Sequence, residues 1–404
     1  MKILFLTIAG RIREISTRGV YKDLLRKFRD EGHDIFVATP SERRYKEKTS
    51  IYKIDGITIL MIRTLNIIQV NWIEKGIATF FLEYQFKKAV KRYFSDVRFD
   101  LVIYSTPPVT FSKVVIYIKN RDNAVSYLLL KDIFPQNAVD LGMIRKGSLV
   151  HRYFRNKEKN LYSISDFIGC MSPANVDFIK KHNPEINPNK LEVNPNSIEP
   201  VILNFNKDQK SGVRLKYRIP LNTPVFVYGG SLGKPQGIDF LIELLSFQIN
   251  NREIFIVIAG SGTYFPKLHS WFSLNRPENM LLLTELPRDE YSLLVQSCDA
   301  GFIFLDGRFT IPNFPSRLLS YLECKIPVIA ATDRNTDLGK IIQENDFGLW
   351  SETGDLQSIN KNIARISQDS ALRSKMGLNG YNYLLKNYTV TNSYMIISKH
   401  FYKT

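Results

Sequence analysis

The chain has 404 residues, more than a single hydrophobic core usually serves, so its length predicts two domains. Hydrophobic residues make up 44% of the chain and charged residues 23%, which excludes a disordered or fibrous protein. The three cysteines, Cys170, Cys298 and Cys324, are too far apart for a disulfide framework or a zinc site. Such cysteines are typical of a protein in a reducing cytosol.

The positive charge is concentrated in the first half. Residues 1–200 carry 33 Lys and Arg against 21 Asp and Glu, a balance of +12, whereas residues 201–404 carry 22 against 18, a balance of +4. Such an excess suits nucleic acid, anionic lipid or an acidic substrate, and charge alone does not choose among them. Because the chain shows no nucleic-acid-binding module and no interleaved aromatic platform, we expect no nucleic-acid partner.

Short apolar runs alternate with amphipathic stretches along the first half. The opening run is too short for a signal peptide and is followed at once by Arg11 and Arg13, so we interpret it as a buried strand. The strands expected in this half are residues 2–8, 34–38, 101–104, 125–130 and 167–171, with a helix at residues 20–31 after the first. Buried strands separated by helices predict a parallel sheet covered on both faces.

The pattern starts again after the polar stretch 204–218. The strands expected in the second half are residues 224–228, 254–259, 280–283, 301–304 and 327–330. The final helices, at residues 358–387 and 390–402, have no strand after them. We therefore predict an α/β protein with two Rossmann-like domains, residues 1–200 and 201–385, and a helix at 386–404 that packs back toward the first domain. In such sheets ligands bind beyond the carboxyl ends of the strands, which favours a site in a cleft between the domains.

Two glycine-rich turns in the second half are candidates for binding phosphate. Residues 229–237, GGSLGKPQG, and residues 259–262, AGSG, each follow an expected strand and precede a helix. Glycines allow the backbone to approach a diphosphate closely, and a helix start carries partial positive charge. The alternative is an ordinary strand-to-helix turn. Neither turn has the dinucleotide-binding pattern, and no P-loop is present.

A third candidate is the start of a helix at residues 314–317, FPSR. A proline suits the first turn, Ser316 is a candidate cap, and Arg317 brings five hydrogen-bond donors to the helix start. The alternative is a capped helix with a solvated arginine.

In order and spacing, these motifs and several others resemble the GT-B glycosyltransferases of family 4, in the bacterial branch that builds O-antigens, capsules and exopolysaccharides. The other motifs are KILFLT at 2–7, RGV at 18–20, EGHD at 31–34, STPP at 105–108, DIFP at 132–135, PNS at 195–197, Tyr321-Leu322 and Pro327-Val328. The resemblance implies the GT-B fold, with the donor bound mainly by the second domain and the acceptor by the first.

The resemblance also implies individual roles. The turn with Gly230, Ser231, Gly233 and Gln236, together with Arg317, would hold the donor diphosphate. The other donor-binding candidates are Gly260, Gly262, Ser316 and Ser320, with Thr284 to Leu286 near the base and Gly19 approaching the sugar phosphate from the first domain.

The chain departs from the family pattern at the donor site. Two Glu residues eight positions apart are usual before the Pro-Val pair, and these positions here are Pro312 and Ser320. The second Glu normally binds the ribose, so that contact has to come from elsewhere. The usual Arg and Lys of the diphosphate turn fall on Ser231 and Gln236, and Lys234 is the candidate to supply the missing charge.

Glycosyl transfer requires stabilisation of the departing diphosphate, for which we select Lys234, Arg317 and the amides around Gly230. We expect no obligatory metal and no other cofactor. At the reacting centre we select Asp132, which follows a buried strand, either to position the acceptor or to act as a general base. The alternative for Asp132 is a helix cap. If configuration is retained, the donor phosphate itself can take the acceptor proton.

The first half also carries a candidate membrane contact. On residues 86–94, five apolar side chains share one helical face and four basic side chains take the other, and the preceding residues 67–81 are unusually apolar. The alternative is a core helix with a solvated basic face. No apolar run approaches 20 residues, so no membrane span is expected.

Together these patterns and the resemblance predict a cytoplasmic transferase at the inner face of the membrane. We expect it to move a sugar from a nucleoside diphosphate sugar, a UDP-sugar, to a polyprenyl-diphosphate-linked saccharide. Two alternatives stay open: a nucleotide-sugar epimerase of the same fold, and a non-catalytic scaffold of polysaccharide assembly.

Overall fold

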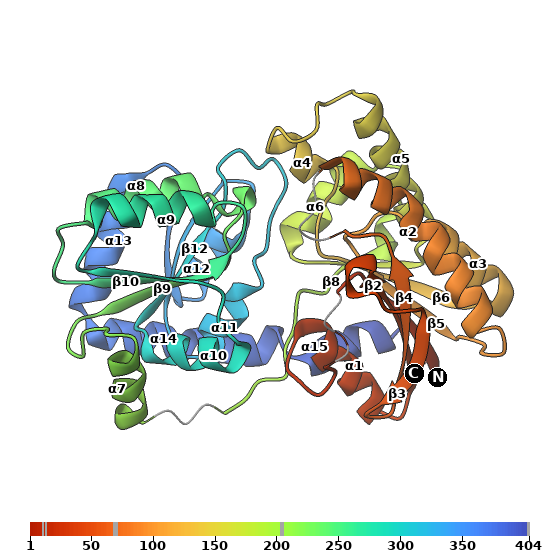
Figure 1. Cartoon of the computed structure of the whole chain (residues 1–404), viewed down its shortest axis with the longest axis horizontal. Coiled ribbons are helices and arrows are strands. Elements are labelled where there is room, and N and C mark those ends of the chain that lie inside the picture. The colour runs from red at the N-terminus through yellow and green to blue at the C-terminus, as the bar shows by residue number, and fades with distance from the viewer. Residues whose placement is uncertain (10–11, 13, 68–71, 203–205, 402–404) are drawn as a thin grey trace. The chain divides into compact units, whose positions relative to one another are not determined.

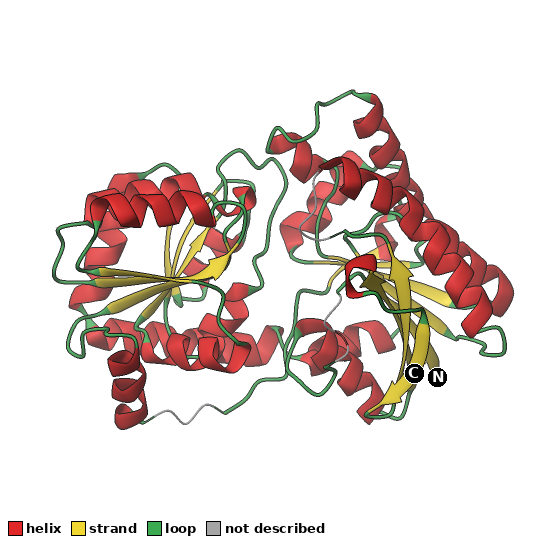
Figure 2. Ribbon diagram, viewed as in Figure 1, coloured by secondary structure: helices red, strands yellow, loops and turns green. Residues whose placement is uncertain are grey.

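The structure is a computed structural model that describes residues 1–9, 12, 14–67, 72–202 and 206–401. The chain divides into two compact units. Unit 1 comprises Met1–Glu199 and Val390–Thr404, and unit 2 comprises Pro200–Thr389. In each unit helices lie on both faces of a mainly parallel sheet (Figures 1 and 2).

The sheet of unit 1 has the strand order β3-β4-β2-β1-β5-β6-β7-β8. Every pairing is parallel except that of β3 with β4. Its strands are β1 (Lys2–Leu6), β2 (Asp34–Glu42), β3 (Ser50–Ile54), β4 (Ile57–Thr64), β5 (Leu101–Ser105), β6 (Val125–Leu130), β7 (Phe167–Cys170) and β8 (Leu191–Val193). Its helices are α1 (Val20–Asp30), α2 (Trp72–Tyr93), α3 (Ser112–Asp122), α4 (Gln136–Asp140), α5 (Leu149–Ile164), α6 (Pro173–His182) and α15 (Val390–Ser398), with short 3₁₀ turns η2 (Arg43–Tyr45) and η3 (Pro188–Lys190).

The sheet of unit 2 has the order β11-β10-β9-β12-β13-β14, and all its pairings are parallel. Its strands are β9 (Val225–Ser231), β10 (Phe255–Ser261), β11 (Met280–Leu283), β12 (Ala300–Phe304), β13 (Val328–Thr332) and β14 (Gly348–Glu352). Its helices are α7 (Lys207–Lys216), α8 (Ile238–Gln248), α9 (Phe265–Asn275), α10 (Arg288–Ser297), α11 (Arg317–Glu323), α12 (Leu338–Glu344), α13 (Leu356–Gln368) and α14 (Ser370–Asn387), with the 3₁₀ turn η4 (Lys234–Gln236). Because parallel strands share one carboxyl edge, the loops that follow these strands meet there.

The last helix of the chain belongs to unit 1. On α15, the Ser393 hydroxyl donates to Asn194 Oδ1 at 2.7 Å. The Tyr394 hydroxyl lies 3.2 Å from Nε2 of His33, which follows α1, and α15 packs on α1. The chain thus leaves unit 1 once, builds unit 2, and returns.

The predicted α/β architecture is confirmed, and so is each predicted strand to within a few residues. The hairpin of β3 and β4 was missed, although Asp55 and Gly56, with φ of 48° and 77°, form the Asp-Gly turn typical of hairpins. Most of the polar stretch after which the pattern starts again forms α7, which belongs to unit 2. The long helix predicted at residues 358–387 is broken at Asp369, whose carboxylate caps α14 by accepting from the Leu372 amide at 2.8 Å.

Candidate functional site

The two predicted glycine turns lie side by side at the carboxyl edge of the unit 2 sheet. In the pairing of β9 with β10, Gly230 lies opposite Gly260. Beyond the strands, the Leu232 amide donates to the Ser261 carbonyl at 2.8 Å, and the Tyr264 amide donates back to the Leu232 carbonyl at 2.9 Å. The two turns are therefore one interlocked backbone structure.

Glycine is required at this crossing because the backbones are too close for side chains. A Cβ on Gly260 would lie 1.9 Å from the Gly230 carbonyl oxygen, and one on Gly262, where φ is +151°, would lie 2.4 Å from the Leu232 oxygen. Gly230 itself has φ +114°, which L residues rarely adopt.

The substitution Gly260→Ala is expected to lower the free energy of unfolding of unit 2 by about 3 kcal/mol. The alanine Cβ would clash with the Gly230 carbonyl oxygen, which is a backbone atom and cannot rotate away as a side chain could. Gly212→Ala is the matched control. Gly212 is exposed on α7 with open space around its Cα, and alanine there should stabilise by about 0.5–1 kcal/mol. Thermal unfolding monitored by circular dichroism measures both, and equal midpoints for the two variants would contradict the proposed close packing.

Arg317, the first residue of α11, lies beside these turns. The carbon at the centre of its guanidinium is 4.3 Å from the centroid of the Tyr228 ring, and it would be 3.9 Å from a Cβ on Gly230. Its Nη1 is buried and has no hydrogen-bond partner among the described residues. Arg317 as a whole is half-buried, so the alternative of a fully solvated arginine is wrong.

The charge of Arg317 is retained in this setting. Burial acts to lower the pKa of the guanidinium, but the neighbouring Tyr228 and Tyr321 keep that pKa above its ordinary value. A buried cation with an unused donor is costly unless an anion lies against it. Arg317 and the glycine turns together are suited to binding an anionic group.

Three tyrosines support this arrangement, the buried Tyr228 and Tyr321 and the half-buried Tyr291, and their role was not predicted from the sequence. The Tyr228 hydroxyl donates to the Ser231 carbonyl at 2.8 Å, which holds the first turn. The Tyr321 oxygen accepts from the Gly229 amide at 3.2 Å, and burial raises the pKa of this phenol to about 12. Tyr291 fills the space that a side chain on Gly229 would need, because its oxygen would lie 1.9 Å from a Cβ there. The sequence signals for them were the adjacency of Tyr228 to Gly229 and the motif Tyr321-Leu322.

The remaining residues of the first turn differ in exposure and in hydrogen bonding. Ser231 is exposed at the end of β9. The Gly233 amide is already used, since it donates to Gln236 Oε1 at 3.1 Å, so Gln236 braces the turn. Lys234 opens η4 and is half-buried. Although burial acts to raise the pKa of Asp306, that pKa is held below its ordinary value by Arg308 and, more weakly, by the charge of Lys234.

The residues predicted near the base follow β11, the strand beside β10. Thr284 is exposed and Leu286 is half-buried. Between them, Glu285 accepts a hydrogen bond from the Ser261 hydroxyl at 2.8 Å, which joins this loop to the second glycine turn.

The cap predicted for Ser316 is wrong. Ser316 precedes α11, but its backbone is itself helical (φ −64°, ψ −19°) and its side chain makes no capping hydrogen bond. A serine cap needs an extended backbone, from which its oxygen can reach the amides of the first turn. Ser320, one turn further along, is half-buried.

In unit 1, Asp132 is held just beyond the end of β6. The Thr106 hydroxyl oxygen accepts from the Lys131 amide at 3.0 Å and from the Asp132 amide at 3.2 Å. Both Asp132 carboxylate oxygens lie 2.8 Å from Asn137 Nδ2, and α4 begins after Pro135 with no side-chain cap. Asp132 is therefore not a helix cap.

Two side chains at this point titrate near neutrality. Burial raises the pKa of Asp132 to about 6, partly offset by the Asn137 hydrogen bond. Burial lowers the pKa of Lys131 to about 7, and its Nζ donates to the Asn194 carbonyl at 3.1 Å. A carboxylate with such a pKa can take a proton at physiological pH.

Gly19, also in unit 1, precedes α1 and does not present a free amide. Its N–H donates to Asp23 Oδ1 at 2.7 Å, and Asp23 in turn pairs with Arg26. This amide is therefore not available to donate to a ligand. The lack of a side chain is what would let a ligand come close to Gly19.

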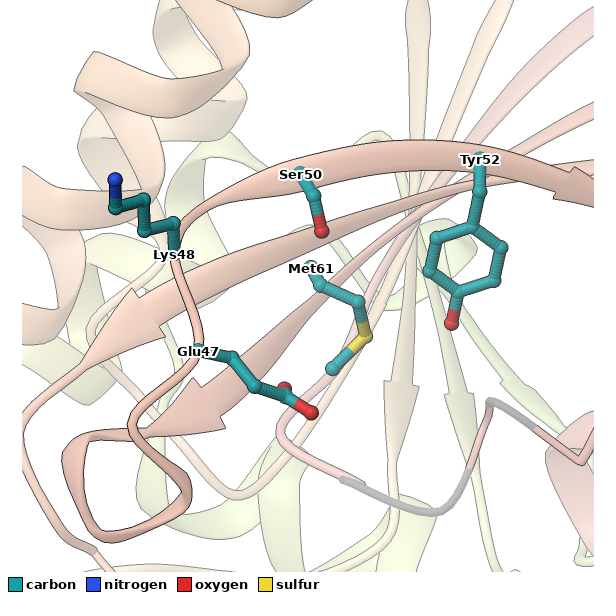
Figure 3. A pocket seen from close by; sticks show the side chains of 5 residues that line it. All are labelled: Glu47, Lys48, Ser50, Tyr52 and Met61. Atoms are coloured by element: carbon teal, nitrogen blue, oxygen red, sulfur yellow. The ribbon is translucent and has the colours of Figure 1, made fainter.

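A separate hollow of about 410 Å³ lies on the β3–β4 hairpin, lined by Glu47, Lys48, Ser50, Tyr52 and Met61. Figure 3 shows Glu47, Ser50, Met61 and Tyr52 extending to the same side of the ribbon, whereas Lys48 points away. The Ser41 hydroxyl donates to Glu47 at 2.6 Å. No residue that we selected from the sequence lines this hollow.

The apolar face predicted at residues 86–94 does not meet a membrane, whereas Ile77, Phe80 and Phe81 of the preceding apolar stretch are exposed. Phe86, Ala89, Val90 and Phe94 are buried in the core of unit 1, because α2 packs this side on β4 and α3. Residues 68–71 of the preceding apolar stretch lie outside the described part of the chain. Among the described residues, no helix is long and apolar enough to span a membrane, and none of the Asp, Glu, His and Cys side chains gather in threes as metal ligands would.

The second unit matches a known family of proteins. Residues 210–383 match the family model Glycosyl transferases group 1. The chain is 22% identical to the probable glycosyltransferase WbjE of Pseudomonas aeruginosa over 287 residues, which are 69% of this chain and 68% of that protein.

Solved structures of similar fold cover both units. Sucrose-phosphate synthase from Thermosynechococcus elongatus matches with a TM-score of 0.77 at 12% identity over 99% of this chain and 98% of its own. Anabaena Alr3699/HepE, solved in complex with UDP, matches with a TM-score of 0.69 at 15% identity over 99% of each chain. The protein therefore has the GT-B fold, carries a glycosyl transferases group 1 domain in its second unit, and is a glycosyltransferase enzyme.

Proposed function

We propose that this enzyme transfers a sugar from a UDP-sugar to a polyprenyl-diphosphate-linked saccharide in surface polysaccharide biosynthesis, at the inner face of the cell membrane. Unit 2 holds the donor and unit 1 the acceptor. The observation that carries the proposal is the half-buried Arg317, whose buried Nη1 has no partner among the described residues, beside Gly230 and the interlocked turns.

The donor assignment follows from charge and access. A pyrophosphate needs cations and hydrogen-bond donors close to its oxygens. Arg317 supplies a planar, charged group of N–H donors, and the neighbouring glycines have no side chains that would block the ligand. Lys234, on the same edge, supplies a second charge. The complex of HepE with UDP, a protein of the same fold, supports a uridine nucleotide as the ligand.

In the reaction, the bond between the sugar anomeric carbon and the diphosphate oxygen breaks, and a bond from that carbon to an acceptor hydroxyl oxygen forms. The leaving diphosphate takes the electron pair, and Arg317 and Lys234 stabilise its charge. The acceptor proton passes to Asp132, or to the donor phosphate if configuration is retained. Because the protein supplies these cations, we propose that no metal is obligatory, and that activity persists in EDTA.

The test is release of UDP from a panel of UDP-hexoses and UDP-N-acetylhexosamines, with and without undecaprenyl-diphosphate-linked N-acetylglucosamine. We expect slow release without the lipid, acceleration by at least tenfold with it, and radiolabelled sugar in the lipid fraction. A soluble epimer formed without acceptor would instead establish an epimerase, and UDP binding with no turnover of any donor would establish a scaffold.

A further inference from the structure

Two helices of unit 1 expose an unusual number of large apolar side chains on one surface. On α2, Ile77, Phe80, Phe81 and Tyr84 are all exposed, with Phe80 at 61%. Their spacing of three and four residues places them on one stripe, opposite the buried side that packs on the core. On α5, Leu149, Val150 and Tyr153 are exposed, with Leu149 at 84%.

These side chains form one continuous surface. The rings of Phe80 and Tyr153 are 6.4 Å apart, and Lys157 on α5 pairs with Glu83 on α2 at 2.9 Å. Figure 1 shows α2 and α5 close together in unit 1. We call this surface, together with exposed Met143 before α5, the α2–α5 face.

The apolar centre has a basic border. The outward stripe of α2 continues into exposed Lys88, Lys91 and Arg92. Around the start of α5, Arg145, Lys146 and Arg152 are exposed. Residues 141–157 contain no Asp or Glu, and Glu83, the one acid in residues 75–95, is buried and paired.

We propose that the α2–α5 face docks on an anionic lipid surface, with its aromatic and aliphatic tips in the acyl boundary and its lysines and arginines among the headgroups. Exposed apolar surface of this extent marks an interaction site, and cations around it are what an anionic leaflet attracts. A second copy of the chain is disfavoured, because a two-fold contact would set this basic border against itself. The inference rests on the proposed function only for the lipid that carries the acceptor.

Binding of the full-length protein to vesicles tests the inference without donor or acceptor. The probes are vesicles of phosphatidylcholine with 30% phosphatidylglycerol and vesicles of pure phosphatidylcholine, measured by flotation. We expect the wild type to float with the anionic vesicles, Phe80→Ser/Leu149→Ser to bind at least tenfold more weakly, and Lys88→Gln/Lys146→Gln/Arg152→Gln to lose its preference for the anionic vesicles.

Unit 2 offers a matched control, Phe247→Ser/Leu274→Ser, since these side chains are 63% and 84% exposed. This pair should bind as the wild type does. The inference is overturned if the wild type does not float, if the control pair weakens binding equally, or if Phe80→Ser/Leu149→Ser instead abolishes self-association in sedimentation velocity. Its failure is separate from that of the proposed function, because transfer to a detergent-solubilised acceptor does not require docking.

Discussion

Replacing Asp132 by Asn is expected to lower kcat by about 10²–10⁴-fold while leaving the affinity for UDP unchanged. The carboxylate is held by Asn137 in unit 1, whereas Arg317 and Lys234, which are proposed to bind the donor diphosphate, lie in unit 2. Because the pKa of Asp132 is about 6, kcat/KM of the wild type should rise with pH through 6 and then level off, and the variant should lack this rise. Steady-state rates from pH 5 to 9 measure both.

Stability distinguishes this effect from misfolding. Folding raises the pKa of Asp132, so the ionised carboxylate opposes folding, and stability is lost as pH rises from about 4 to 6. Asp132→Asn should therefore be more stable than the wild type at pH 8, by on the order of 2 kcal/mol, and equal to it near pH 3. Asp177→Asn, an exposed change on α6, should alter neither rate nor stability. An Asp132→Asn enzyme that retains full kcat would show that another group, such as the donor phosphate, takes the proton.

Replacing Arg317 by Ala is expected to weaken UDP binding by about 10–100-fold, because charged hydrogen bonds of roughly 1.5–3 kcal/mol are lost. Arg317→Lys should recover part of the affinity, since it keeps the charge without the planar fork. Isothermal titration calorimetry of each variant with UDP measures the effect. The fold should not suffer, because the change removes a half-buried cation whose buried Nη1 has no hydrogen-bond partner among the described residues.

The matched control is Arg334→Ala. Arg334 follows β13 of the same sheet, but it is exposed and pairs with Glu352 at 2.7 Å. Its loss should change the affinity for UDP less than threefold. Unchanged binding in Arg317→Ala, or equal losses in the two variants, would remove Arg317 from the donor site.

The strands and glycine turns could be predicted because they depend on local patterns. Apolar runs such as residues 125–130 match buried parallel strands, and glycines after two such runs mark close turns. The position of Arg317 beside Gly230 depends on the strand order, which places the loops after β9 and β12 next to each other. No local sequence pattern predicts that order.

The errors have physical causes. Residues 86–94 show a regular apolar face, but periodicity cannot tell whether a face meets lipid or protein, and here α3 and β4 cover it. The exposed stripe of α2 lies earlier, and its partner on α5 is distant in sequence. Ser316 has the residue type of a cap but a helical backbone, which only the packed structure shows.

The most direct test of the central claim is a spectrum of the protein labelled with ¹⁵N at glycine, recorded while UDP is added. The account predicts that the amide resonances of Gly230, Gly260 and Gly262 in unit 2 shift with UDP and much less with uridine, whereas those of Gly56 and Gly147 in unit 1 stay in place. Unchanged resonances at the three unit 2 glycines under saturating UDP would contradict it.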